Sequence, residues 1–348
     1  ILVALFIIAG NRPEDAHTIK IGAILPLTGN QAHVGEGLKN ALTLALRNVE
    51  KKNTKYNYQL IFEDTQFNSK TAVTLAQKLI DIDHVDAIVD AYAPIGNAIS
   101  PVTETKKVVH IGIAFDPKIA EGKYNFLLFT KPDTAASSLL GEMQKRGIKN
   151  IGVFRVNNQG ILAVYHSLQK LSTDYGVTIT SDEEFQPGER DFRGIIAKSI
   201  KAKPDMYVLL ALSPELELLA KQMNDQGLHN QTTTIYFELA QDKTIFNGLW
   251  SIGYSQTNPT LENEYKAAFN KDMTFGIPNI YDAFNLIVDS AESYGGSDKP
   301  TTDYIADKIQ NLKDVQGTLG VLNINSEGII DSPTTVKIIK DGKMEPIQ

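Results

Sequence analysis

The stretch Ile19–Gly29, IKIGAILPLTG, decides the fold together with the run that follows it. Apolar residues alternate with smaller or polar ones up to Leu25, and Pro26 ends the run, which is typical of a short buried strand. After a loop from Leu27 to Gly37, apolar residues recur at helical spacing: Leu38, Ala41, Leu42, Ala45, Leu46 and Val49. Strand, loop and helix form the first half of a βαβ unit. Ligands bind such units at the carboxyl ends of the strands, so the loop from Pro26 to Gly37 is the first candidate part of a site.

The same alternation continues along the chain and then starts again. Strands are expected at 58–64, 85–91, 108–114, 150–156, 177–185, 206–212, 233–237 and 334–339, and helices at 72–80, 95–106, 133–145, 161–171, 192–202 and 216–223. Asp133 and Asp191 are the expected N-caps of two of these helices. The pattern predicts an α/β fold with two doubly wound parallel-sheet lobes. A chain of 348 residues is also long enough for roughly two domains.

Composition and motifs exclude several classes of function. The net charge of -7 argues against a nucleic-acid partner, and the absence of Cys rules out disulfides and thiol nucleophiles. The six His residues show no metal-ligand spacing, and Gly35, Gly37 and Asn40 miss the third glycine of a dinucleotide fingerprint. The sequence therefore predicts no enzyme, cofactor or metal site, although a hydrolase without a recognisable motif stays open.

The first ten residues, ILVALFIIAG, are almost wholly apolar and are followed by a polar stretch with a Pro. Ten residues are too few to span a bilayer but suit the apolar region of a secretory signal. We expect residues 1–18 to be an export signal remnant or anchor plus linker. A buried first strand or helix is the alternative.

The strand ending in PLTG, the loop with Gly35, the long helix after it and the segment GERDFRGIIAKSIKAKPDMYVLL from Gly188 resemble periplasmic solute-binding proteins of the leucine/isoleucine/valine-binding type. The resemblance extends over 19–342 and implies two lobes joined by three crossover segments. The first lobe would comprise 19–131 and 256–323, the second 132–250 and 329–348, with crossings near 130–133 and hinge crossings at 251–255 and 324–328.

The resemblance also implies which residues face the cleft between the lobes. The candidate ligand-binding residues are Val34, Ala93, Pro94, Ile95, Ala114, Phe115, Asp116, Gln159, Leu212 and Glu238. Free N–H groups at the helix start after Ala91 are further candidates, because they can bind an anion such as a carboxylate. For each of these positions, and for Asn157 and Asn158, a helix cap, a turn or a solvated loop is the alternative.

The chain departs from the family pattern at four of these positions. Amino-acid binders of the family usually have Ser or Thr where Ala93 and Asp116 stand, and aromatic residues where Gln159 and Leu212 stand. Glu238 alone keeps its counterpart, the acidic residue that receives a ligand ammonium. A free branched-chain amino acid therefore does not follow as the ligand, and Asp116 would repel a carboxylate.

The expected function is that of an exported solute-binding protein, in the periplasm or at the outer face of the cytoplasmic membrane. It would close on a small polar ligand, an amino acid or amine-bearing compound, and deliver it to the membrane permease of an ABC importer. No nucleic acid or cofactor is expected, and the membrane would be met only through an N-terminal anchor. The alternative is a sensor or regulatory protein on the same fold with an altered or empty cleft.

Overall fold

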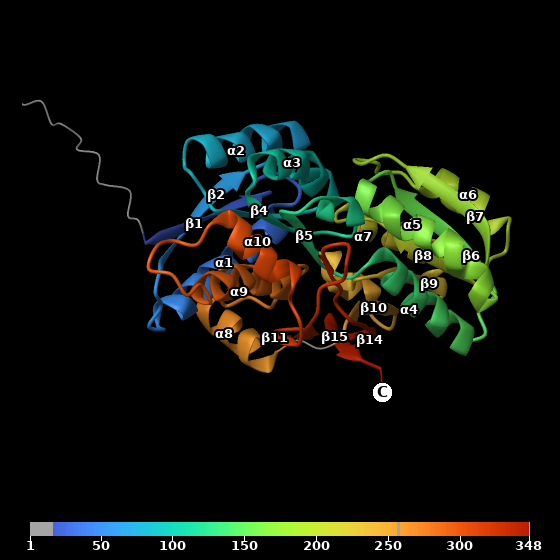
Figure 1. Ribbon diagram of the computed structural model, residues 1–348. Coiled ribbons are helices and arrows are strands. Elements are labelled where there is room, and N and C mark those ends of the chain that lie inside the picture. Colours follow the sequence, from blue (N-terminus) through green and yellow to red (C-terminus); the bar gives the residue numbers. More distant parts are fainter. Residues whose placement is uncertain (1–16, 256–257, 348) are drawn as a thin grey trace, which may run out of the picture.

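The computed structural model describes residues 17–255 and 258–347, which form two α/β lobes side by side (Figure 1). The first lobe is built on a parallel sheet of order β13-β5-β4-β3-β1-β2. Its strands are β1 (Thr18–Leu25), β2 (Asn57–Asp64), β3 (Ala87–Ala91), β4 (Val109–Ile113), β5 (Asn125–Leu128) and β13 (Ile329–Ile330). Its helices are α1 (Ala32–Glu50), α2 (Ser69–Asp81), α3 (Ala93–Lys106), the short η1 (Pro117–Ala120), α8 (Pro259–Phe269), α9 (Ile277–Glu292) and α10 (Thr302–Gln310).

The second lobe is built on a sheet of order β15-β14-β10-β9-β8-β6-β7. Its strands are β6 (Asn150–Val156), β7 (Thr178–Phe185), β8 (Met206–Leu210), β9 (Thr232–Ile235), β10 (Trp250–Tyr254), β14 (Thr334–Lys340) and β15 (Lys343–Pro346), of which the last two run antiparallel to their neighbours. Its helices are α4 (Pro132–Lys145), α5 (Gln159–Leu171), α6 (Arg193–Ile200), α7 (Glu215–Asp225) and the short η2 (Ser172–Tyr175), η3 (His229–Gln231), η4 (Phe237–Leu239) and η5 (Lys243–Phe246). A separate two-stranded hairpin is formed by β11 (Val315–Gly317) and β12 (Gly320–Leu322). The predicted fold class is confirmed.

The stretch around β1 organises the first lobe. β1 lies between β2 and β3, and its residues from Ile21 to Leu25 are all buried. α1 begins at Ala32, so the expected loop up to Gly37 is shorter than predicted. The helix can begin this early because Gly35 lies very close to Pro26: a Cβ at Gly35 would overlap the Pro26 carbonyl oxygen. Glycine therefore lets the first turn of α1 pack directly against the end of β1.

The two expected helix caps differ in the structure. The N-cap of α4 is Lys131, because Pro132 takes the first helical position. Asp133 accepts hydrogen bonds from Ser167 Oγ at 2.6 Å and Lys170 Nζ at 2.8 Å instead. The N-cap position of α6 is Phe192, one residue later than expected, but Asp191 Oδ1 still accepts the N–H of Arg193, the first residue of α6, at 3.2 Å. The Asp191 carboxylate is also paired with the guanidinium of Arg193, which lowers the pKa of Asp191 to about 2.

Strand pairing corrects two expected crossings. Ile329 and Ile330 pair with β5 in the first sheet, although they were expected in the second lobe. Both are buried there, because apolar side chains cover the otherwise open edge of β5. Residues 251–254, expected as a hinge, belong to β10 of the second sheet. The chain therefore leaves the second sheet beyond Tyr254 and the first sheet beyond Ile330.

Residues 1–16, the greater part of the expected export segment, lie outside the described residues. The sheet already begins at Thr18, which pairs with Asn57, so the boundary at residue 18 is too late by one residue. In the described part of the chain, no helix is long and apolar enough to cross a membrane.

Candidate functional site

A small apolar cavity of about 20 Å³ lies between the lobes at the carboxyl ends of their strands. It is lined by Tyr92, Ala93, Ala114, Phe115 and Phe275 from the first lobe and by Asn158, Gly160, Ile161, Leu212 and Leu239 from the second. The structure thus brings together four of the predicted cleft residues, Ala93, Ala114, Phe115 and Leu212. A cavity of this size holds about one water molecule.

The lobes come close together at this cavity, with space for about one methyl group at Gly160. A Cβ added to Gly160, in the first turn of α5, would lie 3.4 Å from Ala93 Cβ and 3.7 Å from Phe115 Cβ. Tyr92 next to Ala93 has a φ of 78°, a conformation that is costly for a residue with a side chain. Such strain is held in place by surrounding contacts and clusters at functional positions, which marks this loop as part of the site.

The start of α3 offers fewer free donors than the sequence suggested. Pro94 has no N–H group, and the N–H groups of Ile95 and Gly96 both donate to the Tyr92 carbonyl at 3.0 Å. In this turn only the Ala93 N–H has no hydrogen-bond partner among the described residues. The expected anion site at this helix start is therefore reduced to a single donor.

Asp116 and Gln159 meet in a separate polar pocket of about 430 Å³ between α3, η1 and α5. Asn97 Nδ2 donates to Asp116 Oδ2 at 2.7 Å and to Gln159 Oε1 at 3.1 Å, which joins the two lobes. Asp116 Oδ1 accepts the Lys118 N–H at 3.1 Å. Sequence reasoning missed Asn97, because it lies one turn inside a helix rather than at the end of a strand.

Gln31 forms a second bridge between the lobes. Its Nε2 donates to the Ser213 carbonyl at 2.7 Å, and its Oε1 accepts from Tyr92 OH at 2.7 Å. Only 5% of Gln31 is exposed, and it lies inside the loop from Pro26 to Gly37 that the sequence marked as a candidate. The sequence located this loop but not the residue, because a polar loop carries no signal for its partner on the other lobe.

Glu238 does not line the apolar cavity; its carboxylate lies against Gly253 of β10 and Lys337 of β14, in its own lobe. It is 7% exposed, its Oε1 pairs with Lys337 Nζ of β14 at 3.4 Å, and its Oε2 is buried without a hydrogen-bond partner in the described residues. Its neighbour Leu239 lines the cavity. Of the other predicted residues, Val34 and Ile95 are buried and Pro94 is half-buried, and none of the three lines the apolar cavity or the polar pocket.

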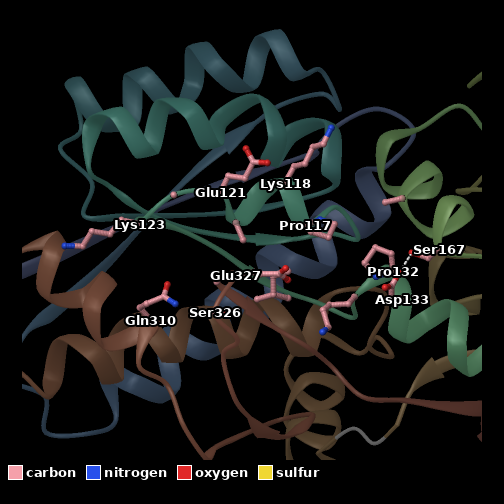
Figure 2. Close-up of a pocket in the computed structure, with 16 residues that line it drawn as sticks. Pro117, Lys118, Glu121, Lys123, Pro132, Asp133, Ser167, Gln310, Ser326 and Glu327 are labelled. Carbon is pink, nitrogen blue, oxygen red and sulfur yellow. Dashed lines mark hydrogen bonds between the residues drawn. The ribbon is translucent and has the colours of Figure 1, made fainter. Parts of the chain in front are cut away.

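A larger groove of about 880 Å³ runs along one side of the lobe interface (Figure 2). η1 and the turn with Ser326 and Glu327 form its first-lobe wall, and Pro132, Asp133 and Ser167 form its second-lobe wall. The groove adjoins the polar pocket, because Lys118, Glu121 and Ala163 line both. Its charges are mixed.

An aromatic cluster fills the base of the interface. Phe129, at the first crossing, packs on Phe115 and Phe275 of the first lobe and on Tyr236 and Tyr254 of the second, with ring centroids 4.7–6.1 Å apart. Burial raises the pKa of both tyrosines well above the ordinary value, so both stay neutral. The cluster is a continuous apolar contact between the lobes.

Polar contacts tie the crossing segments together next to this cluster. Thr130 Oγ1 is hydrogen-bonded to Tyr236 OH and donates to the Ser332 carbonyl at 2.9 Å. Asp331 accepts from the Lys131 N–H at 2.8 Å and from Thr134 Oγ1 at 2.7 Å. These contacts hold the first and third crossings side by side.

The polar side chains at the lobe interface are suited to binding a ligand by hydrogen bonds and charge. Within 17–255 and 258–347, no group of three or more His, Cys, Asp or Glu side chains is placed to hold a metal ion. The polar side chains at the interface are amides, hydroxyls and partly paired carboxylates. Side chains of both lobes can therefore contact the hydrogen-bonding and charged groups of one ligand at the same time.

Comparisons with known proteins agree with this geometry. The family model described as periplasmic binding protein matches residues 18–329. The Leu/Ile/Val-binding protein BraC3 of Rhizobium johnstonii is 22% identical over 346 residues, covering 90% of this chain and 89% of the relative. The leucine-, isoleucine-, valine-, threonine-, and alanine-binding protein of Pseudomonas aeruginosa is 25% identical over 306 residues, covering 81% of this chain and 80% of the relative.

Solved structures show the same fold with different ligands. The leucine binding protein LivK of Thermotoga maritima matches with a TM-score of 0.85 and 21% identity, over 95% of this chain and 98% of that chain. A solute binding protein of R. palustris in complex with 4-hydroxybenzoate matches with a TM-score of 0.85 and 18% identity, over 95% and 96%. The fold alone therefore does not identify the ligand.

Proposed function

Because the chain belongs to the periplasmic binding protein family, we propose that it is an exported solute-binding protein that closes on a small amine-bearing ligand, such as an amino acid, and delivers it to the permease of an ABC importer. The observation that carries this proposal is the cavity at the carboxyl ends of the strands, lined from both lobes. A ligand that contacts both lobes stabilises the closed arrangement, which is all that capture requires.

The side chains around the cavity support this ligand class. Ala114, Phe115 and Leu212 present an apolar surface for the body of the ligand. Glu238 Oε2 lacks a hydrogen-bond donor among the described residues and would accept one from an ammonium group that reached it. Asp116 adds a second carboxylate in the neighbouring polar pocket. Ligand pockets usually measure about 300–1,000 Å³, so the lobes must part to admit the ligand and then close around it.

Ligand binding should therefore compact the protein. We expect the radius of gyration, measured by small-angle X-ray scattering, to fall when a saturating ligand is added to protein purified after unfolding and refolding to remove bound solute. A panel of amino acids and amines screened by thermal shift supplies the ligand. An unchanged radius at saturation would argue against a closing cleft.

Replacing Glu238 by Gln should weaken binding of an amine ligand at least about tenfold, or about 1.4 kcal/mol, because the neutral amide loses a charge-assisted hydrogen bond. Isothermal titration calorimetry measures the affinity. Glu183→Gln is the matched control: Glu183 is a buried second-lobe carboxylate whose partner, Lys198, is 2.8 Å away on the outer side of the lobe. Equal affinities for the Glu238→Gln and Glu183→Gln proteins would remove Glu238 from this role.

The small volume of the cavity favours one second candidate, a sensor or regulatory protein that uses the closed form without a cargo. A Cβ at Gly160 would already contact Ala93 Cβ and Phe115 Cβ, so the lobes leave little space there for a ligand. This candidate predicts no thermal shift with any amino acid, amine or aromatic acid tested. A shift with one of them, accompanied by compaction, would decide for the transport function.

A further inference from the structure

The side chain of Gln31 serves the other lobe rather than its own helix. Gln31 occupies the N-cap position of α1, but its side chain makes no capping hydrogen bond there. Its Nε2 donates instead to the Ser213 carbonyl of the second lobe at 2.7 Å. Tyr92 OH donates to Gln31 Oε1 at 2.7 Å, which fixes the end of the amide that faces Ser213. Removal of this side chain would therefore break the bridge without removing a helix cap.

The groups joined by this bridge are buried in the closed arrangement. Gln31 and Tyr92 are each 5% exposed, and Ser213 is 2% exposed. A hydrogen bond is stronger where water is excluded, and a buried polar group that loses its partner costs free energy. With a shorter side chain at position 31, closure would bury the Ser213 carbonyl and the Tyr92 hydroxyl without this partner. The closed form should therefore depend on the Gln31 amide.

The bridge from Asn97 to Gln159 is exposed by comparison. Asn97 is half-buried and Gln159 is exposed. Asn97 Nδ2 lies 3.1 Å from Gln159 Oε1 and donates to Asp116 Oδ2 of its own lobe at 2.7 Å. When the lobes part, water can replace the Gln159 contact, so its net contribution to closure should be small. The interface thus offers one buried and one exposed bridge for comparison.

Both ends of the Gln31 bridge adjoin the apolar cavity. Tyr92 lines this cavity from the first lobe, and Leu212, directly before Ser213, lines it from the second. The bridge joins groups of the protein itself, so it forms whenever the lobes meet, with or without a ligand. It breaks when they separate, because its donor and its acceptor belong to different lobes.

We propose that Gln31 is an interlobe latch, a side chain whose hydrogen bonds hold the lobes closed, so that part of the protein is closed before a ligand binds and a captured ligand leaves slowly. The inference rests on the closing motion in the proposed function. Contacts made only in the closed form shift the equilibrium toward that form. Such contacts change the rate of ligand dissociation more than the rate of association.

The test measures the separation of the lobes without any ligand. The chain has no Cys, so dyes on Lys70→Cys of the first lobe and Lys201→Cys of the second, both at exposed positions, report this distance by single-molecule energy transfer. In protein freed of bound solute by unfolding and refolding, we expect both closed and open molecules. Gln31→Ala should lower the ratio of closed to open molecules at least about fivefold.

Further variants separate the latch from other contacts. Tyr92→Phe keeps the ring but removes the hydroxyl that orients the bridging amide, so it should lower the ratio by a smaller factor. Gln159→Ala removes the exposed bridge and should change the ratio less than about twofold. Gln222→Ala is the matched control and should leave the ratio unchanged. Gln222 accepts the Phe192 N–H and donates to the Arg190 carbonyl, both at 2.8 Å, within the second lobe.

A ligand-free protein in which all molecules are open would overturn the inference, as would equal ratios in the wild-type and Gln31→Ala proteins. Circular dichroism checks that each variant is folded. Should Gln31→Ala fail to fold, equal ratios in the wild-type and Tyr92→Phe proteins would overturn the inference instead. If amines bind and compact the wild-type protein while Gln31→Ala leaves the ratio unchanged, the latch fails and the proposed function stands. If no amino acid or amine binds while Gln31→Ala opens the lobes, the latch stands and the proposed function fails.

Discussion

An alanine in place of Phe129 should lower the free energy of unfolding by about 3–5 kcal/mol. Phe129 is fully buried and its ring contacts four other aromatic rings, drawn from both lobes. Truncation removes these contacts and leaves a cavity that rigid neighbouring rings cannot fill. Urea denaturation followed by circular dichroism measures the change.

Two controls accompany this variant. Phe129→Leu keeps most of the buried volume and should cost clearly less than the alanine variant. Phe269→Ala removes a half-buried ring of α8 whose only ring partner in the described part of the chain is Tyr265, and it should also cost less. If Phe129→Ala cost no more than Phe269→Ala, the aromatic cluster would not be the connection between the lobes that its geometry indicates.

Replacing His110 by Leu should cost about 3–5 kcal/mol at neutral pH, because it leaves Asp90 buried without its partner. Both side chains are fully buried in the first sheet, with His110 Nε2 at 2.8 Å from Asp90 Oδ1. His110 Nδ1 lies 3.1 Å from Asn125 Oδ1, which already accepts from Thr103 Oγ1, so Nδ1 carries a proton and donates. Asp90 Oδ2 has no hydrogen-bond partner among the described residues.

The loss in His110→Leu should shrink as the pH is lowered. Burial raises the pKa of Asp90, and removal of His110 takes away what opposes this rise. A carboxyl group whose folded-state pKa exceeds the unfolded value favours the folded state at low pH and loses that contribution as pH rises through the folded-state pKa. Denaturation at pH 5 and pH 8 measures the difference.

Two variants complete this experiment. The double variant Asp90→Leu/His110→Leu should recover most of the stability, because an apolar pair leaves no charge uncompensated. His166→Leu, at an exposed position, should change the stability by less than about 0.5 kcal/mol. A cost below 1 kcal/mol for His110→Leu would mean that the pair contributes little.

Local periodicity explains how much of this protein could be predicted from its residues alone. The alternation over 19–25 predicts a buried strand, and the helical spacing from Leu38 to Val49 predicts an amphipathic helix. Each element has an apolar face that must be buried in the folded protein. Repeated along the chain, these patterns predict two mainly parallel sheets, but they do not show that β14 and β15 run antiparallel to their neighbours. They also place the loops with Ala93, Phe115 and Leu212 at the carboxyl ends, where the structure brings them together.

Contacts between distant segments are decided by the packed structure, because no local pattern records them. In the sequence Ile329 and Ile330 are only an isolated apolar pair. Their place in the first lobe follows from their pairing with the edge strand β5. The partnership of Gln31 with Ser213 spans 182 positions and joins two lobes, so neither residue marks the other. The same holds for Glu238. Its position shortly after β9 can be predicted from the local sequence, but its ion pair with Lys337 depends on the antiparallel pairing of β14 with β10.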